Sequence, residues 1–211
     1  MIIKYERTIH YLMCVMGGFF GGYALLLRHG FGSAATGNLL ECMISLSLGN
    51  FEEVMIRFGG GLMFLLPFMV SKWMELKTDC NRKDFSIALS CAGLIILGFL
   101  PGTVHPVLAL YPLFFITGFQ WSVFSGVKEY PCSTIFISNN TRQCFSALAE
   151  YLVTKDIKMR SKSAFYGFSI CCFLAGGFLA AFLTGRFGPE ASFGGIAILL
   201  LVKCIMRSAR V

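Results

Sequence analysis

Long stretches without a charged side chain dominate the chain and are separated by short polar segments. Residues 8–27, 85–127 and 163–185 contain no Lys, Arg, Asp or Glu. A run of about 20 apolar residues is enough to cross the hydrocarbon core of a bilayer. Overall, 56% of the residues are hydrophobic and 14% are charged, whereas a soluble domain carries about 25% charged residues. The pattern predicts an all-α polytopic membrane protein.

The hydrophobic pattern divides the chain into eight segments. They cover residues 8–27, 33–50, 54–76, 85–100, 107–127, 133–153, 163–185 and 191–206. Pro101 and Pro106 interrupt the pattern after the fourth segment, because proline cannot continue a helix. No low-complexity linker separates the segments, so residues 1–211 are expected to form a single membrane domain.

Two segments, 33–50 and 133–153, are too polar at their start for ordinary spans. If both enter the membrane and return on the same side, six true spans remain. Fourteen of the 18 basic residues then lie on the side of the N-terminus and three lie opposite, with Arg142 inside a segment. Eight short spans, the alternative, would divide the basic residues ten to seven. Basic residues concentrate in cytoplasmic loops, which favours six transmembrane helices plus two re-entrant half-helices, with both termini cytoplasmic.

The same order of segments occurs twice. At an offset of 102, Asn38 matches Asn140 and Cys42 matches Cys144; at an offset of 100, Gly18 matches Gly118. Repeat one covers about residues 8–100 and repeat two about 107–206. Each repeat holds an odd number of true spans, so the second enters the membrane upside down. Such inverted repeats, with interrupted helices near the bilayer midplane, are common in transporters.

The polar starts of the two half-helices resemble capping boxes. Asn38 is followed by Glu41 at the third position, and Asn140 by Gln143. In a capping box the first residue caps the helix and the third accepts its backbone N–H in return. We therefore expect the helices to begin at Asn38 and Asn140. Their N-termini would meet near the midplane, each with about half a positive charge.

Charge and cysteine content exclude other classes. The formal net charge of +7 follows from the basic loops, so nucleic acid is not an expected partner. The nine cysteines show no CxxC spacing, which predicts neither disulfides nor a metal site, and no cofactor is indicated. The three histidines are scattered near segment ends and are assigned no chemistry.

Three motifs resemble the YoaK family of bacterial membrane proteins over nearly the whole chain. They are Thr36-Gly37-Asn38 after a glycine-rich span, a G-x-Q element at Gly118 and Gln120, and Thr141-Arg142 followed by Leu148-Ala149. Two positions depart from the family pattern: glycines occupy positions 21–22, where an acidic residue is common, and Ser138-Asn139-Asn140 replaces T-G-x. The resemblance implies a transporter or efflux protein in the bacterial cytoplasmic membrane.

The polar residues of the two half-helices and the fifth span are the candidate substrate-binding residues. They are Thr36, Gly37, Asn38, Glu41, Gln120, Ser138, Asn139, Asn140 and Arg142. Glu41 is either a capping acceptor or a proton or cation site, since an acid within the membrane is costly. Arg142 either pairs with Glu41 or clamps an anion. Gln120 serves equally well as an interhelical hydrogen-bond donor.

These expectations favour a transporter or channel for a small solute, with an anion suggested by the helix N-termini and Arg142. The alternative is a non-transporting membrane scaffold or sensor subunit. An enzyme is not expected, because no nucleophile lies beside a base and no histidine falls in the half-helices. The expected partners of the protein are the solute and the lipid bilayer. The sequence leaves the oligomeric state open, and a homodimer is compatible with this interpretation.

Overall fold

The computed structural model describes residues 2–30, 35–127 and 129–208. The helices of the first half are α1 (Ile2–Arg28), α2 (Ala35–Ser47), α3 (Phe51–Lys77) and α4 (Arg82–Phe99). The second half contains α5 (Pro106–Ala109), α6 (Tyr111–Val123), α7 (Ser138–Thr154), α8 (Ile157–Phe187), the 3-10 turn η1 (Gly188–Ala191) and α9 (Ser192–Ser208). Each predicted segment thus contains a helix.

The long helices run beyond the apolar segments at their polar ends. α8 begins at Ile157, six residues before the predicted apolar run, because the Asp156 side chain caps it by accepting from the backbone N–H of Lys158. The predicted segment 107–127 is instead broken at Leu110 and ends at Val123. Beyond it, Gly126 adopts a φ of +125° and begins a two-residue strand.

A short antiparallel hairpin therefore replaces the end of the predicted fifth span. Its strands β1 (Gly126–Val127) and β2 (Tyr130–Pro131) pair Gly126 with Pro131. The hairpin belongs to a small buried cluster with Cys132, Phe165 and Tyr166, and the Tyr166 hydroxyl donates to the carbonyl oxygen of Pro131 at 2.7 Å. The hydrophobic pattern did not predict this element, because its apolar residues continue those of the helix.

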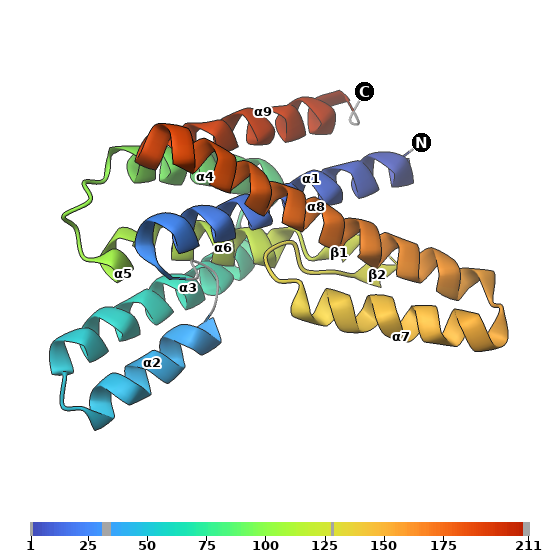
Figure 1. Cartoon of the computed structure of the whole chain (residues 1–211). Helices are drawn as coiled ribbons and strands as arrows, with labels where there is room; N and C mark the ends of the chain where they lie inside the picture. The colour runs from blue at the N-terminus through green and yellow to red at the C-terminus, as the bar shows by residue number, and fades with distance from the viewer. Residues whose placement is uncertain (1, 31–34, 128, 209–211) are drawn as a thin grey trace.

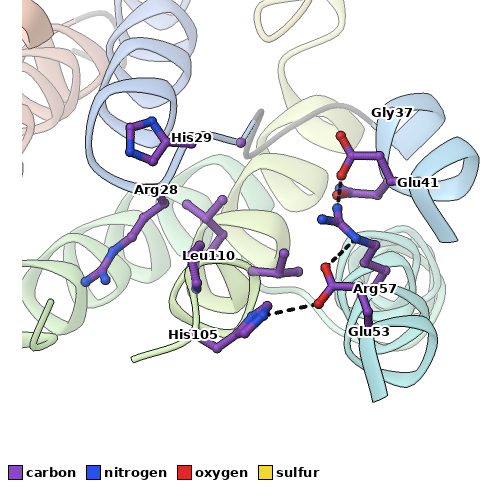
Figure 2. A pocket seen from close by; sticks show the side chains of 12 residues that line it. Arg28, His29, Gly37, Glu41, Glu53, Arg57, His105 and Leu110 are labelled. Atoms are coloured by element: carbon purple, nitrogen blue, oxygen red, sulfur yellow. Dashed lines mark ion pairs between the residues drawn. The ribbon is translucent and has the colours of Figure 1, made fainter. Parts of the chain in front are cut away.

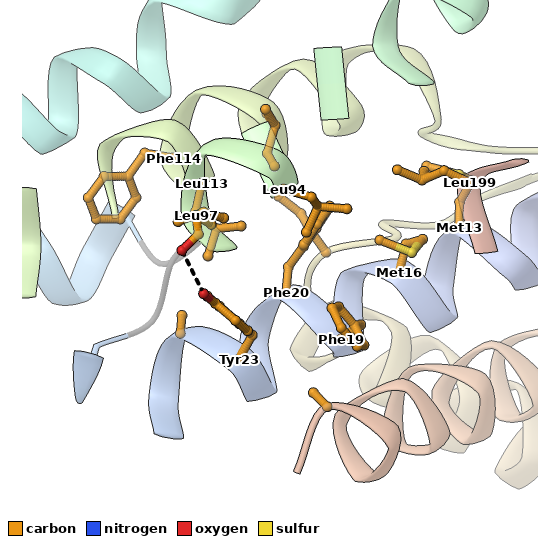
Figure 3. Close-up of a cluster of buried hydrophobic side chains, with 14 of the residues drawn as sticks. Met13, Met16, Phe19, Phe20, Tyr23, Leu94, Leu97, Leu113, Phe114 and Leu199 are labelled. Carbon is orange, nitrogen blue, oxygen red and sulfur yellow. Dashed lines mark hydrogen bonds between the residues drawn. The ribbon is translucent and has the colours of Figure 1, made fainter. Parts of the chain in front are cut away.

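α1 lies at the centre of the fold. Of its membrane-length stretch 61% is buried, against 22% for α3 and 17% for the α8–α9 stretch. Figure 3 shows its aromatic side chains pointing into a core built with α4, α6 and α9. The Tyr23 hydroxyl donates to the carbonyl oxygen of Leu97 at 3.1 Å, which ties α1 to the end of α4.

Helix pairing follows a regular scheme. α1 packs along α8, and α6 packs along α3. The two shorter helices lie at the periphery, α2 against α3 and α7 against α8, without another extensive partner among the described helices. In Figure 1, α2 and α7 both begin near the middle of the molecule and run outward in opposite directions.

Three stretches of the described chain are long and apolar enough to cross a membrane. They are Tyr5–Arg28, Phe51–Lys77 and Ile157–Ser208, the last of which joins α8 to α9. Many large hydrophobic side chains on these helices are exposed, among them Met55, Met69 and Phe178. This composition indicates a helical membrane protein.

Candidate functional site

A polar cavity of about 330 Å³ lies where the ends of four helices converge. It is shown in Figure 2. Arg28, His29 and Gly30 contribute from the end of α1, and α2 contributes Gly37, Asn38 and Glu41. Its other lining residues are Glu53, Arg57, His105, Pro106, Val107 and Leu110. The cavity contains two arginines, two histidines and two carboxylates, so its lining is strongly charged.

A tight helical hairpin places α2 beside α3. Gly49 adopts a φ of +73°, a left-handed conformation that glycine takes without strain, and the next residue begins the return. The Asn50 side chain caps α3 by accepting from the backbone N–H of Glu53 at 3.2 Å. Glu41 precedes Gly49 by eight positions and Arg57 follows it by eight. The two side chains therefore meet across the hairpin.

Arg57 is the centre of the charged cluster. Its guanidinium pairs through Nη1 with Glu41 and through Nε with Glu53, the latter at 2.6 Å. The far oxygen of Glu53 lies 3.2 Å from Nε2 of His105. The Arg57 and Glu53 side chains are each only 18% exposed, whereas that of Glu41 is 56% exposed. The Arg57 guanidinium thus pairs with two carboxylates, of which that of Glu41 is accessible to solvent.

The second arginine of the cavity is held by backbone oxygens. Arg28 is 7% exposed, and its guanidinium donates to the carbonyl oxygens of Leu100 and Pro101 at 3.1 Å each and to that of Val104 at 3.4 Å. These carbonyls lie at and beyond the C-terminus of α4, where the helix dipole is negative. Arg28 therefore fixes the α4–α5 connection against the end of α1.

The cavity contains three of the four predicted residues of the first half. Gly37, Asn38 and Glu41 line it, whereas Thr36 is exposed and is not among its lining residues. The helix itself begins at Ala35, so Asn38 lies within its first turns. The predicted cap at Asn38 is wrong, because helical backbone already extends past that residue toward α1.

The predicted cap at Asn140 is also wrong. α7 begins at Ser138, its N-cap position is Ile137, and Asn140 is buried inside the first turn. The Asn140 side chain donates to the carbonyl oxygen of Ser133 at 2.7 Å and to that of Phe136 at 3.1 Å, and accepts from the N–H of Ser133 at 3.3 Å. It folds the preceding loop onto the helix instead of capping it.

Gln120 is buried elsewhere, between α6 and α1. Its side-chain nitrogen donates to the carbonyl oxygen of Met13 and to the Thr134 hydroxyl, both at 3.1 Å. Its side-chain oxygen has no hydrogen-bond partner among the described residues. The interhelical hydrogen-bonding role is thus present, and Gln120, 0% exposed, lies apart from the charged cavity.

The remaining second-half candidates lie apart from the charged cavity. Ser138 lines a largely apolar groove with glycines of α1 and Phe173 of α8. Arg142 is exposed and donates to the side-chain oxygen of Asn139 at 3.0 Å. The suggested pair between Glu41 and Arg142 is wrong, since Glu41 pairs with Arg57. The structure thus divides the predicted residues between several places.

Residues that the sequence pattern did not single out complete the cavity. They are Arg28, Glu53, Arg57 and His105. Two signals pointed to Glu53 and Arg57: their i,i+4 spacing, and the equal spacing of Glu41 and Arg57 from Gly49. No local pattern pointed to Arg28 or His105. No group of three or more His, Cys, Asp or Glu side chains suited to a metal ion occurs among the described residues.

Comparison with known proteins gives a family. A family model described as protein of unknown function (DUF1275) matches residues 9–206. Neither a curated protein nor a solved structure matches the chain. Because the match extends from the first helix to the last, it covers the cavity and both halves of the fold. The chain belongs to the DUF1275 family of proteins of unknown function.

Proposed function

We propose that the protein is a membrane transporter or channel for a small solute. In this proposal the chain forms two inverted repeats with six membrane spans, namely α1, α3, α4, α5–α6, α8 and α9, and two re-entrant half-helices, α2 and α7. The charged cavity between α1, α2, α3 and α5 is its solute site. The proposal is supported most by the way each half packs against the other.

The first support is a pair of matching close approaches. A Cβ atom at Gly18 of α1 would lie 1.8 Å from the carbonyl oxygen of Phe173 on α8. A Cβ atom at Gly118 of α6, 100 positions later, would lie 2.5 Å from the carbonyl oxygen of Phe64 on α3. Small residues at crossings let helices in lipid approach closely. If the two halves are exchanged, α1 takes the place of α6 and α8 takes the place of α3, so each crossing takes the place of the other. A pair of related repeats requires this correspondence.

The half-helices show the same equivalence. The Cys42 thiol donates to the carbonyl oxygen of Val54 at 3.7 Å, and the Cys144 thiol donates to that of Ser163 at 3.4 Å. Ser163 follows Val54 by 109 positions, and Phe173 follows Phe64 by the same number. One offset therefore relates α3 to α8 at both contacts, although no sequence identity marks the first pair.

The depth of α2 fits a re-entrant helix. Glu41 lies level with Arg57, and α2 begins six residues earlier, at Ala35, which corresponds to about 9 Å along the helix. Because α2 and α3 are antiparallel, this start lies level with the middle of the 27-residue α3. A helix that begins at that depth requires a cavity or protein around its start, and α2 contributes Gly37, Asn38 and Glu41 to the charged cavity.

The positive-inside rule orients the proposed fold. It places both termini and the α3–α4 loop in the cytoplasm. The charged cavity then opens on the outer side, and the β1–β2 hairpin lies on the inner side. The bacterial cytoplasmic membrane is the location that the sequence resemblance supports.

Transport is tested with purified protein in liposomes, using labelled acetate, succinate, phosphate and methylammonium as probes. Asn38→Trp fills the cavity and should abolish the uptake that the unmodified protein supports. Leu40→Trp is the matched control, because Leu40 lies two positions away with a side chain 61% exposed. Equal uptake by both variants would contradict the assigned site. No uptake of any probe by the unmodified protein would favour a non-transporting scaffold.

Orientation is tested with the native thiol of Cys80, which is exposed in the α3–α4 loop. In a variant lacking Cys171 and Cys204, the other exposed cysteines, an impermeant maleimide should label Cys80 only after the cells are opened. Labelling in intact cells would contradict the six-span orientation.

A further inference from the structure

The Arg57–Glu41 pair is built differently from the rest of the charged cluster. Glu53 is on the same helix as Arg57, four residues before it, and is 18% exposed. Glu41 comes from α2, is 56% exposed, and meets the guanidinium at Nη1, the side that faces away from Glu53. Figure 2 shows Glu41 and Glu53 approaching Arg57 from opposite sides at the edge of the cavity. Glu53 is thus the fixed partner and Glu41 the exchangeable one.

α2 has few other attachments that would prevent such an exchange. Its extensive contacts among the described helices are with α3 alone, and many of its large side chains, including Leu39, Leu40 and Met43, are more than half exposed. The Glu41–Arg57 pair is the only ion pair that joins α2 to α3 among the described residues. In the described chain, a second polar contact joins the two helices: the Cys42 thiol, a weak donor, donates to the carbonyl oxygen of Val54.

We infer that Arg57 binds the carboxylate of an anionic solute, and that Glu41 is the internal carboxylate which the solute displaces. This inference rests on the proposed transport function and names its substrate class. A planar guanidinium binds a carboxylate through two parallel N–H donors. Once Glu41 leaves, the carboxylate of a solute can accept both of these hydrogen bonds. Departure of Glu41 also removes the ion pair that fastens α2. Solute binding is thereby linked to movement of the half-helix.

The described residues of the second half place other side chains at the equivalent positions. With the offset of 109 that relates α3 to α8, Tyr166 stands where Arg57 stands, and the offset of 102 places Gln143 at the position of Glu41. The Tyr166 hydroxyl is already bonded to the carbonyl oxygen of Pro131. Among the described residues, the inferred carboxylate site is therefore expected once, on the face where α2 enters, and not once in each proposed repeat.

Calorimetric titration of the full chain in detergent tests the inference. The probes are acetate, succinate, phosphate and methylammonium at constant ionic strength. A tethered competitor acts at an effective concentration of roughly millimolar, so Glu41→Gln should tighten carboxylate binding, by about ten-fold if the site alone binds a carboxylate with a Kd of about 0.1 mM. Arg57→Lys keeps the charge and loses the planar fork, so it should weaken binding, and Arg57→Gln should abolish it.

Two controls separate this site from general charge effects. Glu52→Gln removes the same charge from the exposed start of α3 and should leave the affinity unchanged. Arg186→Gln removes an exposed arginine that stacks on Phe182 and should do the same. A melting measurement on each variant distinguishes a lost site from a lost fold, and Glu41→Gln keeps the test decisive if Arg57→Gln does not fold.

Three outcomes would overturn the inference. They are carboxylate binding no tighter in Glu41→Gln than in Glu52→Gln, phosphate bound in place of both carboxylates, and methylammonium bound only while Glu41 is present. If succinate uptake continues alongside any of them, the transport proposal stands and the assigned anion site fails. Glu41-dependent succinate binding without uptake would support the site and reject transport.

Discussion

The α2–α3 and α7–α8 hairpins share one packing scheme and differ in chemistry. In each, a cysteine thiol donates to a backbone carbonyl oxygen of the following long helix, and that long helix crosses a glycine of the other half. The first hairpin carries the Glu41–Arg57 pair beside an open cavity. The second carries Tyr166 and Phe165, buried with Tyr130 of the β1–β2 hairpin. Contacts made by backbone and small side chains are shared, whereas the large polar side chains differ.

The largest expected effect comes from the glycine crossings. Gly18→Ala would place Cβ against the carbonyl oxygen of Phe173, which cannot move without its helix, and should cost about 3 kcal/mol or more of stability. Gly118→Ala, with 2.5 Å to the corresponding oxygen, should cost less, about 1–3 kcal/mol. Thermal unfolding in detergent measures the order.

Gly21 provides the control for both crossings. Its added Cβ would meet only the Phe173 ring, at 3.9 Å, and alanine is the better helix former by about 1 kcal/mol. Gly21→Ala should therefore be neutral or stabilising. A loss as large as that of Gly18→Ala would show that the close contact at Gly18 is not the cause.

The next effect tests the chemical difference between the hairpins. Arg57→Gln leaves Glu53 and Glu41 without their cation in a partly buried place and should destabilise the protein by about 2 kcal/mol. Tyr166→Phe, at the position that the proposed repeat relates to Arg57, removes one hydrogen bond to Pro131 and should cost about 1 kcal/mol. Equal losses, measured by the same unfolding assay, would mean that the ion pairs contribute no more than a single neutral hydrogen bond.

The smallest effect tests the similarity. Cys42→Ser and Cys144→Ser each replace the thiol with a hydroxyl that can donate to the same carbonyl oxygen. Both should therefore change stability by less than about 1 kcal/mol and by similar amounts. Comparison of the two melting temperatures is sufficient. A large loss at one position alone would break the proposed equivalence of the half-helices.

Helices were predictable from the sequence, but the partners of polar side chains were not. Apolar runs place the helices because each run must be buried or face lipid, whatever the arrangement. The partner of Glu41 depends on how α2 is rotated against α3, which the turn at Gly49 decides. Counting eight residues on each side of Gly49 would have identified Arg57, while the distant Arg142 was an arginine of the wrong hairpin.

Asn38 and Asn140 illustrate a second limit. A polar residue followed three positions later by Glu or Gln is typical of a helix start, and the real starts lie only a few residues upstream. The side chain of Asn140 instead contacts a loop seven residues earlier in the chain. Similarly, His105 gained a role only because the α4–α5 connection brings it to Glu53. Local pattern carries no information about such contacts.

The close approach at Gly18 has a mechanical consequence. At Gly18 the backbones of α1 and α8 approach each other without an intervening side chain. A sliding or rotating movement of one helix against the other would bring backbone atoms into a clash, so the pair is expected to move as one unit. The crossing of Gly118 with α3 makes a second one. The peripheral helices α2 and α7, which pack extensively only on α3 and α8 respectively among the described helices, are less constrained. Under the proposed transport function, movement is therefore expected in α2 and α7 and not between α1 and α8.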